Sequence, residues 1–401
     1  MQQQKKNILI ISGTLPPEAS ATSIVVQKIL HPLKELGCCV EGLTVKQNFC
    51  DEAEIDYKGM SIYKADCVLY PAVTIRCAKD FFYKVYQRLK NSKREKAVYT
   101  ERVVRALVKK MKCLPMERYD WVIALCAYYE AAEALARYKR EYGLNAKTAL
   151  YQVDPLAGNQ TFNRDDPLEL QAYEETLYRT FDHVFTTPVI LQEKKRLGWD
   201  TAAVTALELP ISLEQHEVKV AKRDEIRCVY AGYLYGQLRD ASFTLRLFAQ
   251  MQDPRIQLYF VGNGQKKLLS AYNKGALKGR LHLLGEKPAK ECDEILADAD
   301  VLVNIGNTVN NQTPSKLLHY LGFGKPILNV ISCVDCPSLS YVENYPLVLN
   351  VDGTRQEPAD VTEIQEWITE NRGKKVDYSE VAKLLTHCTP EYIAEQIYRN
   401  L

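Results

Sequence analysis

Short apolar runs alternate with helical patterns along most of this chain, and the alternation occurs in two successive series. The first apolar run, at residues 8–11, contains no polar residue, which is typical of a strand buried on both faces of a parallel sheet. Val26, Ile29, Leu30 and Leu33 follow it at helical spacing. A strand, a helix and a further strand in this order predict an α/β fold.

Further runs of strand type extend both series. In the first series they are residues 40–45, 121–125, 148–153 and 183–186, the last of which we expect to end this half. In the second series they are residues 227–232, 256–261, 281–285, 301–304 and 325–328. With 401 residues the chain exceeds the size at which one hydrophobic core stops growing. We therefore expect two doubly wound, Rossmann-like α/β domains facing each other across a cleft, with ligands at the carboxyl ends of the strands.

The composition is that of an ordinary globular protein, with 46% apolar and 25% charged residues. No apolar run approaches the roughly 20 residues that span a bilayer, and residues 8–11 are too few for the core of a signal peptide. These observations predict a cytoplasmic protein. The 12 cysteines are scattered, and the CxxC pair Cys333 and Cys336 lacks a second pair or histidines at ligand spacing. We expect reduced thiols and no bound metal, with metal or redox use of this pair as the alternative.

The most informative segment is residues 308–326, TVNNQTPSKLLHYLGFGKP. Thr313 is a favourable N-cap residue, and Pro314 suits the first helical position, where its missing N–H group costs nothing. The N–H groups of Ser315 and Lys316 would then lack partners within the helix. They would point, with the positive end of the helix dipole, toward a ligand such as a phosphate. The Lys316 side chain adds a cation.

Ser315 and His319 are four residues apart and could face the same ligand. Leu317 and Leu321 have the same spacing and would face the core. The alternative is a capped surface helix with an isolated lysine and a hydrogen-bonded histidine. The spacing alone does not separate these two interpretations.

Residues 313–328, TPSKLLHYLGFGKPIL, resemble the nucleotide-sugar-binding helix of family-4-like glycosyltransferases of the GT-B fold. Other segments resemble this family in the same order along the chain. They are residues 8–23 with their Pro-Pro loop, 151–155 ending in Asp-Pro, 230–240, 261–264 and 389–394. Each similarity is weak by itself, whereas their order and spacing make the set specific.

The resemblance implies transfer of a sugar from a nucleotide-sugar donor, with retention of the anomeric configuration and without a metal or another cofactor. It implies an acceptor-side domain over residues 1–208, a linker over 209–225 and a nucleotide-sugar-binding domain over 226–378. The final helix, within residues 379–401, crosses back to the N-terminal domain in this family.

The resemblance also indicates site residues. Arg239 and Lys316, with the helix N-terminus, would neutralise the leaving nucleoside diphosphate. The predicted donor-binding residues are Gly232, Arg239, Gly262, Asn311, Thr313, Ser315, Lys316 and His319. The predicted catalytic residues are Asp154, at the end of a strand, and Glu18, in the Pro-Pro loop.

The chain departs from the family at three positions. Asn311 and His319 stand where the family usually has two glutamates, and Tyr233 stands where it often has an arginine. A neutral histidine offers one acceptor nitrogen where a carboxylate offers two oxygens, so contact with the nucleotide ribose should weaken or rearrange. These departures leave open a second hypothesis, a catalytically silent GT-B homologue that acts as a binding or scaffold protein. A GT-B enzyme of other chemistry, such as an epimerase or a phosphorylase, is an intermediate alternative.

Residues 79–118 contain 13 basic and 4 acidic side chains. Because the whole chain carries a formal charge of +2, the remaining residues carry −7. The first half of this segment contains the aromatic residues Phe81, Phe82, Tyr83 and Tyr86, and the second half contains the apolar residues Val103, Val104, Leu107 and Val108.

Basic amphipathic stretches with aromatic residues are typical of contact with an anionic membrane. We therefore expect a glycan or lipid-linked acceptor in cell-surface polysaccharide biosynthesis, with the protein cytoplasmic or peripheral at the inner face of the membrane. The alternative is a solvated helix pair with buried aromatic residues. No motif supports nucleic-acid binding, so we expect none.

Overall fold

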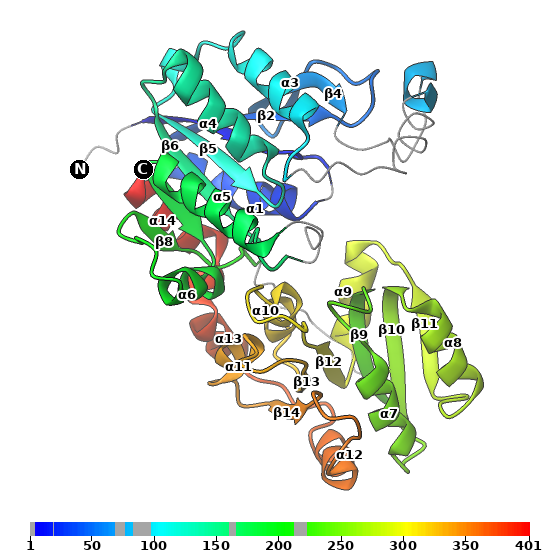
Figure 1. Cartoon of the computed structure of the whole chain (residues 1–401). Helices are drawn as coiled ribbons and strands as arrows, with labels where there is room; N and C mark the ends of the chain where they lie inside the picture. Colours follow the sequence, from blue (N-terminus) through cyan, green and yellow to red (C-terminus); the bar gives the residue numbers. More distant parts are fainter. Residues whose placement is uncertain (1–4, 19, 69–76, 83–97, 160–165, 212–222) are drawn as a thin grey trace. The chain divides into compact units, whose positions relative to one another are not determined.

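The computed structural model of the chain describes residues 5–18, 20–68, 77–82, 98–159, 166–211 and 223–401 (Figure 1). The chain forms two compact units. Unit 1 comprises Met1–Pro210 and His387–Leu401, and unit 2 comprises Ile211–Thr386. The break after Pro210 lies inside the predicted linker 209–225, whereas the return to unit 1 begins later than the predicted residue 379.

Unit 1 is built on an eight-stranded sheet in the order β3-β4-β2-β1-β5-β6-β7-β8. The strands are β1 (Lys6–Ile11), β2 (Cys38–Lys46), β3 (Glu54–Tyr57), β4 (Met60–Val68), β5 (Trp121–Cys126), β6 (Lys147–Gln152), β7 (His183–Thr186) and β8 (Val204–Ala206). Neighbouring strands are parallel except β3, which runs antiparallel to β4. The strands predicted for the first series are confirmed. The expectation that residues 183–186 form the last strand is wrong, because the short β8 pairs with β7.

The central strand β1 is buried on both faces because its side chains alternate between two hydrophobic cores. Leu9 and Ile11 share one core with α3, α4 and α5, and Ile8 and Ile10 share the other with α1 and α14. The helices of unit 1 are α1 (Ala21–Glu35), α3 (Glu101–Met111), α4 (Glu130–Tyr142), α5 (Pro167–Thr180), α6 (Pro188–Arg196) and α14 (Pro390–Asn400), with a 3₁₀ turn at Met116–Arg118. Helices on both faces of a largely parallel sheet make this unit doubly wound.

Helix α14 completes the core of unit 1 after the chain has passed through unit 2. Ile393, Ala394 and Ile397 are buried against the face of the sheet that α1 also covers. Beyond the helix, the indole Nε1 of Trp121 donates a hydrogen bond to the carbonyl oxygen of Leu401 (2.6 Å). Unit 1 therefore depends on residues from both sides of unit 2.

Helix α3 occupies much of the second half of the basic segment 79–118. Its apolar side chains, Val103, Val104, Leu107, Val108 and Met111, are all buried in a core of unit 1. Arg102, Arg105 and Lys109 are exposed. The apolar face that we expected to contact a membrane therefore packs against the protein itself. Tyr83 and Tyr86 lie outside the described residues.

Unit 2 contains a six-stranded parallel sheet in the order β11-β10-β9-β12-β13-β14. The strands are β9 (Ile226–Leu234), β10 (Ile256–Gly264), β11 (Leu281–Gly285), β12 (Val301–Ile305), β13 (Ile327–Ile331) and β14 (Val348–Asp352). The helices are α7 (Ser242–Gln250), α8 (Lys266–Lys274), α9 (Ala289–Asp298), α10 (Ser315–Leu321), α11 (Ser338–Val342), α12 (Val361–Glu370) and α13 (Tyr378–Leu384), and a 3₁₀ turn at Thr386–Cys388 leads back to unit 1.

The two faces of the unit 2 sheet are buried as well. Cys228 and Tyr230 of β9 lie in a core with side chains of α7 and α12, and the intervening Val229 is buried on the opposite face. The prediction of two doubly wound α/β domains is confirmed. None of the described helices is both long and apolar enough to cross a bilayer.

Candidate functional site

The strand order of unit 2 creates a switch point between β9 and β12. From β9 the sheet extends through β10 and β11 on one side and through β12, β13 and β14 on the other (Figure 1). The loops after β9 and β12 therefore leave the same edge of the sheet next to each other, where open α/β sheets bind their ligands. Gly232 and Arg239 lie at the end of β9 and in its loop, and Asn311 to Lys316 lie after β12.

The two loops are tied together by hydrogen bonds that the sequence did not indicate. The N–H group of Thr308 donates to the carbonyl oxygen of Leu238 (2.9 Å), and its hydroxyl donates to that of Gln237 (2.7 Å). The guanidinium of Arg239 donates through Nη2 to Oδ1 of the buried Asn307 (2.7 Å). These bonds hold Arg239 at the switch point.

Gly232 and Gly262 face each other in register at the ends of β9 and β10. Both have positive φ angles, +155° and +130°. A Cβ atom on Gly262 would lie 2.1 Å from the carbonyl oxygen of Gly232, and a Cβ atom on Gly232 would lie 2.3 Å from Cε of Lys316. Only glycine leaves this space free, so the Lys316 side chain lies directly against the backbone of Gly232.

Two cationic side chains lie at the switch point, and neither has an anionic partner among the described residues. Within the part of the chain that the structure describes, Lys316 forms no hydrogen bond or ion pair and Arg239 forms no ion pair. The buried Nε atom of Arg239 has no hydrogen-bond partner either. Burial lowers the pKa of the Lys316 ammonium, and the positive charge of Arg239 lowers it further. A bound anion would compensate both charges, so the arrangement suits a phosphate or diphosphate group.

His319 is engaged by a neighbouring helix. Its Nε2 atom lies 2.9 Å from Oδ1 of Asp293 on α9, and its ring meets the ring of Phe323 edge-on, with centroids 5.2 Å apart. Ser315, one turn earlier, is exposed. The histidine therefore matches the hydrogen-bonded alternative that the spacing left open, and Asp293 was not indicated by the sequence.

The helix that carries these residues begins later than predicted. α10 starts at Ser315, and Pro314 is its N-cap residue, with φ −78° and ψ 70°. The N–H group of Ser315 donates to the carbonyl oxygen of Thr313 (2.9 Å), and the Thr313 hydroxyl is buried without a hydrogen-bond partner among the described residues. The predicted Thr313 cap is thus wrong, because the non-helical Pro314 separates Thr313 from the helix. Asn311 is buried in the loop ahead of it.

Tyr320 supports the site, although the sequence did not indicate it. Its hydroxyl accepts a hydrogen bond from the N–H group of Ala231 (2.7 Å) and donates to the carbonyl oxygen of the same residue (3.2 Å). Tyr320 therefore fixes α10 to the end of β9, one residue before Gly232. The only sequence signal was a tyrosine one helical turn after Lys316.

The predicted catalytic residues lie in unit 1 near an equivalent switch point, between β1 and β5. Glu18 lies in the loop after β1, where its carbonyl oxygen accepts a bond from Ser23 Oγ. Asp154 follows β6, the neighbour of β5. The Asp154 carboxyl forms no hydrogen bond or ion pair with any described residue, and burial raises its pKa.

Two groups of side chains have the composition or spacing of metal ligands. Asp298 and Asp300 have Asp-x-Asp spacing, but both pair with Arg223, at 2.9 Å and 3.1 Å. Cys50, Cys77 and Asp80 bring their ligand atoms within 4.8 Å of one another. The Asp80 carboxylate accepts bonds from the N–H groups of Phe49 (3.0 Å) and Cys77 (3.1 Å), which accounts for its place without a metal. The expectation of no metal stays a prediction.

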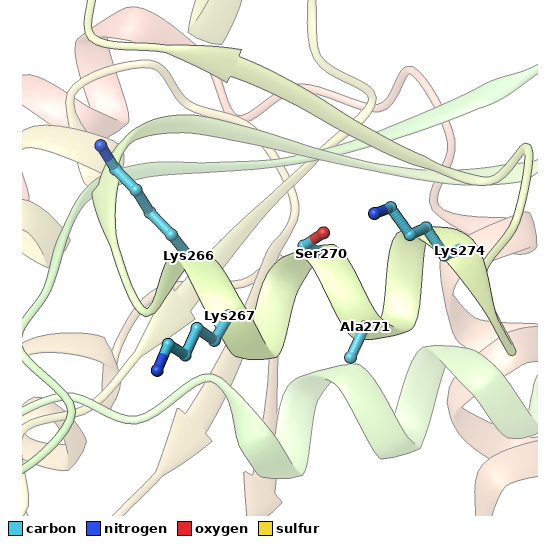
Figure 2. A pocket seen from close by; sticks show the side chains of 5 residues that line it. All are labelled: Lys266, Lys267, Ser270, Ala271 and Lys274. Atoms are coloured by element: carbon cyan, nitrogen blue, oxygen red, sulfur yellow. The ribbon is translucent and has the colours of Figure 1, made fainter.

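A surface hollow of about 550 Å³ lies along α8, and its lining contains none of the predicted site residues. Figure 2 shows the five side chains that line it, all from this one helix: Lys266, Lys267, Ser270, Ala271 and Lys274. Because a single helix face supplies the lining, no side chain from another element converges on it. We assign it no ligand.

No protein-family profile matches the chain, and no curated protein matches it either. Solved structures do match along nearly the whole chain. Sucrose-phosphate synthase from Thermosynechococcus elongatus matches with 14% identity and a TM-score of 0.65, over 99% of this chain and 94% of that one.

The lipopolysaccharide outer core galactosyltransferase WaaB matches with 12% identity and a TM-score of 0.61, over 98% of both chains. Anabaena HepE, solved in complex with UDP-glucose, matches with 13% identity and a TM-score of 0.59, over 98% of this chain and 95% of that one. At these identities the matches establish the fold, and the fold is that of the GT-B glycosyltransferases.

Proposed function

We propose that the protein is a retaining, metal-independent glycosyltransferase that moves a sugar from a nucleotide-sugar donor to a glycan or lipid-linked acceptor in cell-surface polysaccharide biosynthesis. The observation that carries the proposal is the pair of cations Lys316 and Arg239 at the switch point of unit 2, which have no anionic partner among the residues that the structure describes. A diphosphate is the part of a nucleotide sugar that requires such a pair. WaaB, a galactosyltransferase, and HepE, solved with UDP-glucose, share the fold and support the same substrate class.

The proposed chemistry follows from where charge develops. When the bond between sugar and diphosphate breaks, negative charge accumulates on the leaving diphosphate. Lys316 and Arg239 are held in place before the reaction, so they stabilise that charge without rearranging. Because side chains supply the compensation, we propose that no divalent metal ion is needed.

Asp154 and Glu18 are the proposed acceptor-side residues. The raised pKa of Asp154 brings its carboxyl closer to the pH at which a group both binds and releases protons efficiently. We propose that Asp154 accepts a hydrogen bond from the attacking hydroxyl, and that Glu18 contributes to binding the acceptor. Positioning of the two substrates then supplies much of the rate.

Calorimetric titration with UDP and UDP-glucose tests the donor site. We expect binding by the unaltered protein and at least tenfold weaker binding by Lys316→Met, because a charge-assisted contact to phosphate is lost. Lys278→Met is the matched control, since Lys278 is an exposed lysine of unit 2, and it should bind as the unaltered protein does. If neither nucleotide binds at millimolar concentration, or if both variants lose affinity equally, the donor-site assignment is wrong.

The second candidate function is that of a catalytically silent binding or scaffold protein. It is favoured by His319, whose ring nitrogen is engaged by Asp293. A screen of nucleotide sugars for hydrolysis separates the two candidates. Turnover of any donor, lost in Lys316→Met, would exclude the silent homologue, whereas nucleotide binding without turnover would support it.

We propose membrane contact through a narrower surface than the whole basic segment. Phe81 and Phe82 are 50% and 69% exposed, with ring centroids 5.8 Å apart, and the exposed Lys79 lies two residues away. Flotation with liposomes of anionic lipid should recover the protein, and Phe81→Ser/Phe82→Ser should reduce the recovery. Leu168→Ser, at an exposed leucine on α5, is the control. Equal recovery with neutral and anionic lipid would contradict the electrostatic contact.

A further inference from the structure

An ion pair lies completely inside unit 1, away from solvent. The ammonium of Lys194 on α6 lies 2.7 Å from Oε2 of Glu174 on α5, and both side chains are 0% exposed. Glu193 provides a second carboxylate at 3.1 Å, and the Lys194 ammonium also lies 4.6 Å from the centre of the Trp199 ring. None of these residues belongs to the sites described above.

Glu174 also belongs to a buried hydrogen-bond network at the end of β6. Its Oε1 atom accepts a bond from Nε2 of Gln152 and lies 3.4 Å from the hydroxyl of Tyr129. The Gln152 amide in turn donates to the Tyr129 hydroxyl (2.5 Å) and accepts a bond from the hydroxyl of Tyr178 (2.5 Å).

Two members of this network reach the loop that carries Asp154. Glu174 Oε1 accepts a hydrogen bond from the N–H group of Leu156 (3.0 Å), and the Tyr129 hydroxyl donates to the carbonyl oxygen of Asp154 (3.2 Å). The backbone is therefore held at residue 154 by a side chain from the start of α4, and at residue 156 by a side chain from α5. The Asp154 side chain itself forms no bond with any described residue.

Stability alone does not account for such a network. A buried ion pair is often no more stabilising than apolar side chains of the same volume, because both charges must leave water. A fully bonded buried network does, however, fix the groups that it touches in one arrangement. Here those groups are the backbone atoms on either side of the Asp154 carboxyl.

We propose that Glu174 and Tyr129 are positioning residues that fix the Asp154 carboxyl at the carboxyl edge of the unit 1 sheet. Lys194 balances the charge of Glu174 so that its carboxylate remains available to the loop. This inference rests on the proposed function, in which Asp154 meets the acceptor. It adds to that function the residues that hold Asp154 in place.

A double-mutant cycle of Tyr129→Phe and Asp154→Asn tests, without any substrate, whether Tyr129 positions Asp154. Burial raises the pKa of the Asp154 carboxyl, so Asp154→Asn removes a group that is costly to ionise and should raise the melting temperature at pH 8. The gain should shrink as the pH falls toward 4, because less of the carboxyl is ionised. Tyr129→Phe releases the Asp154 carbonyl and lets the loop hydrate. In the Tyr129→Phe background, the gain from Asp154→Asn at pH 8 should therefore fall to less than half.

Tyr178→Phe is the matched control, because it removes a hydroxyl of the same network that does not touch the loop. Its effect on the melting temperature should be additive with that of Asp154→Asn, as for two independent sites. If the effect of Tyr129→Phe on the melting temperature is also additive with that of Asp154→Asn, the network does not position Asp154 and the inference is overturned. Because both tyrosine variants keep the ring, the comparison holds even if each lowers the melting temperature.

Donor hydrolysis provides a second readout. Tyr129→Phe should lower kcat about tenfold and leave the donor KM unchanged, since the donor residues lie in unit 2, whereas Tyr178→Phe should keep kcat within about twofold. UDP binding measured on the same variants separates the two proposals. If UDP binds but the effects of Tyr129→Phe and Asp154→Asn on the melting temperature are additive, this inference alone is overturned. If the two effects are coupled but no nucleotide binds, the proposed function alone is overturned.

Discussion

The charge of Lys316 is unfavourable for the stability of the fold, but it is the charge that is proposed to bind the diphosphate. The half-buried side chain of Lys316 lies against Gly232 and is influenced by the charge of Arg239, and no described carboxylate compensates it. A lysine whose pKa is lower in the folded than in the unfolded protein destabilises the fold at pH values where the unfolded chain is protonated. Lys316→Met should therefore raise the melting temperature at pH 7.5 while it weakens UDP binding. A lower melting temperature would show that the charge is compensated in solution.

The lowered pKa also predicts a pH dependence of nucleotide affinity. As pH rises, Lys316 loses its proton earlier than an ordinary lysine with a pKa of about 10.4, so UDP affinity should fall across the range from pH 7.5 to 10. Lys316→Arg should flatten this profile because a guanidinium stays charged. Calorimetry over this pH range measures both. An identical fall in the two proteins would assign the pH dependence to another group.

Gly262 and Gly279 allow a matched test of the close approach between β9 and β10. Both have positive φ, but a Cβ atom at Gly279 would meet nothing within 4 Å, whereas at Gly262 it would lie 2.1 Å from a backbone oxygen. Gly279→Ala should cost about 1 kcal/mol for the backbone conformation alone. Gly262→Ala should cost more, measured by thermal or urea unfolding. Equal losses would contradict the close contact.

At the scale of elements, two threonines that precede helices behave differently. Thr389 accepts a bond from the N–H group of Tyr392 (3.3 Å) at the start of α14, whereas the buried Thr313 hydroxyl ahead of α10 has no hydrogen-bond partner in the described part of the chain. Thr389→Val should cost about 1 kcal/mol as a lost cap. Thr313→Val should be neutral or stabilising, because it removes a buried polar group without a hydrogen bond. A similar loss in both would mean that Thr313 is satisfied in solution.

The elements that could be predicted from the sequence are those with a strong local signal. β5 is an uninterrupted apolar run, and β1 contains the apolar run 8–11 and β6 the apolar run 149–151, because both faces of these strands are buried. The edge strands β3 and β8 lack such runs, since each has exposed or half-buried positions. Neither strand could be recognised from periodicity.

The candidate site divides in the same way. Gly232, Arg239 and Lys316 were indicated by motif and spacing. The residues that hold this region together were not indicated, because each is far away in sequence from the residue that it bonds. Asn307 bonds Arg239, Asp293 bonds His319, and Tyr320 bonds Ala231, the neighbour of Gly232. The Thr313 cap was predicted from local preference and is wrong because the backbone at Pro314 is not helical.

At the scale of the whole molecule, unit 1 and unit 2 have separate cores, so damage to one should spare the other. Ile393 of α14 is 0% exposed in unit 1, and Ile368 of α12 is 0% exposed in unit 2. Ile393→Ala should destabilise unit 1 by about 2–5 kcal/mol and leave UDP affinity unchanged. Ile368→Ala should lower the stability of unit 2 instead, where UDP is proposed to bind. Calorimetric scans with and without UDP would assign each transition, and a UDP-dependent shift of the unit 1 transition would contradict the separation.

The position of α14 sets an order of events during synthesis. Every residue of unit 2 leaves the ribosome before residues 387–401, which unit 1 needs for one of its two cores. Domains generally fold as units, starting with those made first. Unit 1 is therefore begun first and completed last. While unit 2 is translated, α14 does not yet cover its part of one apolar face of the unit 1 sheet. This apolar face of unit 1 is therefore where we expect a chaperone of nascent chains to bind.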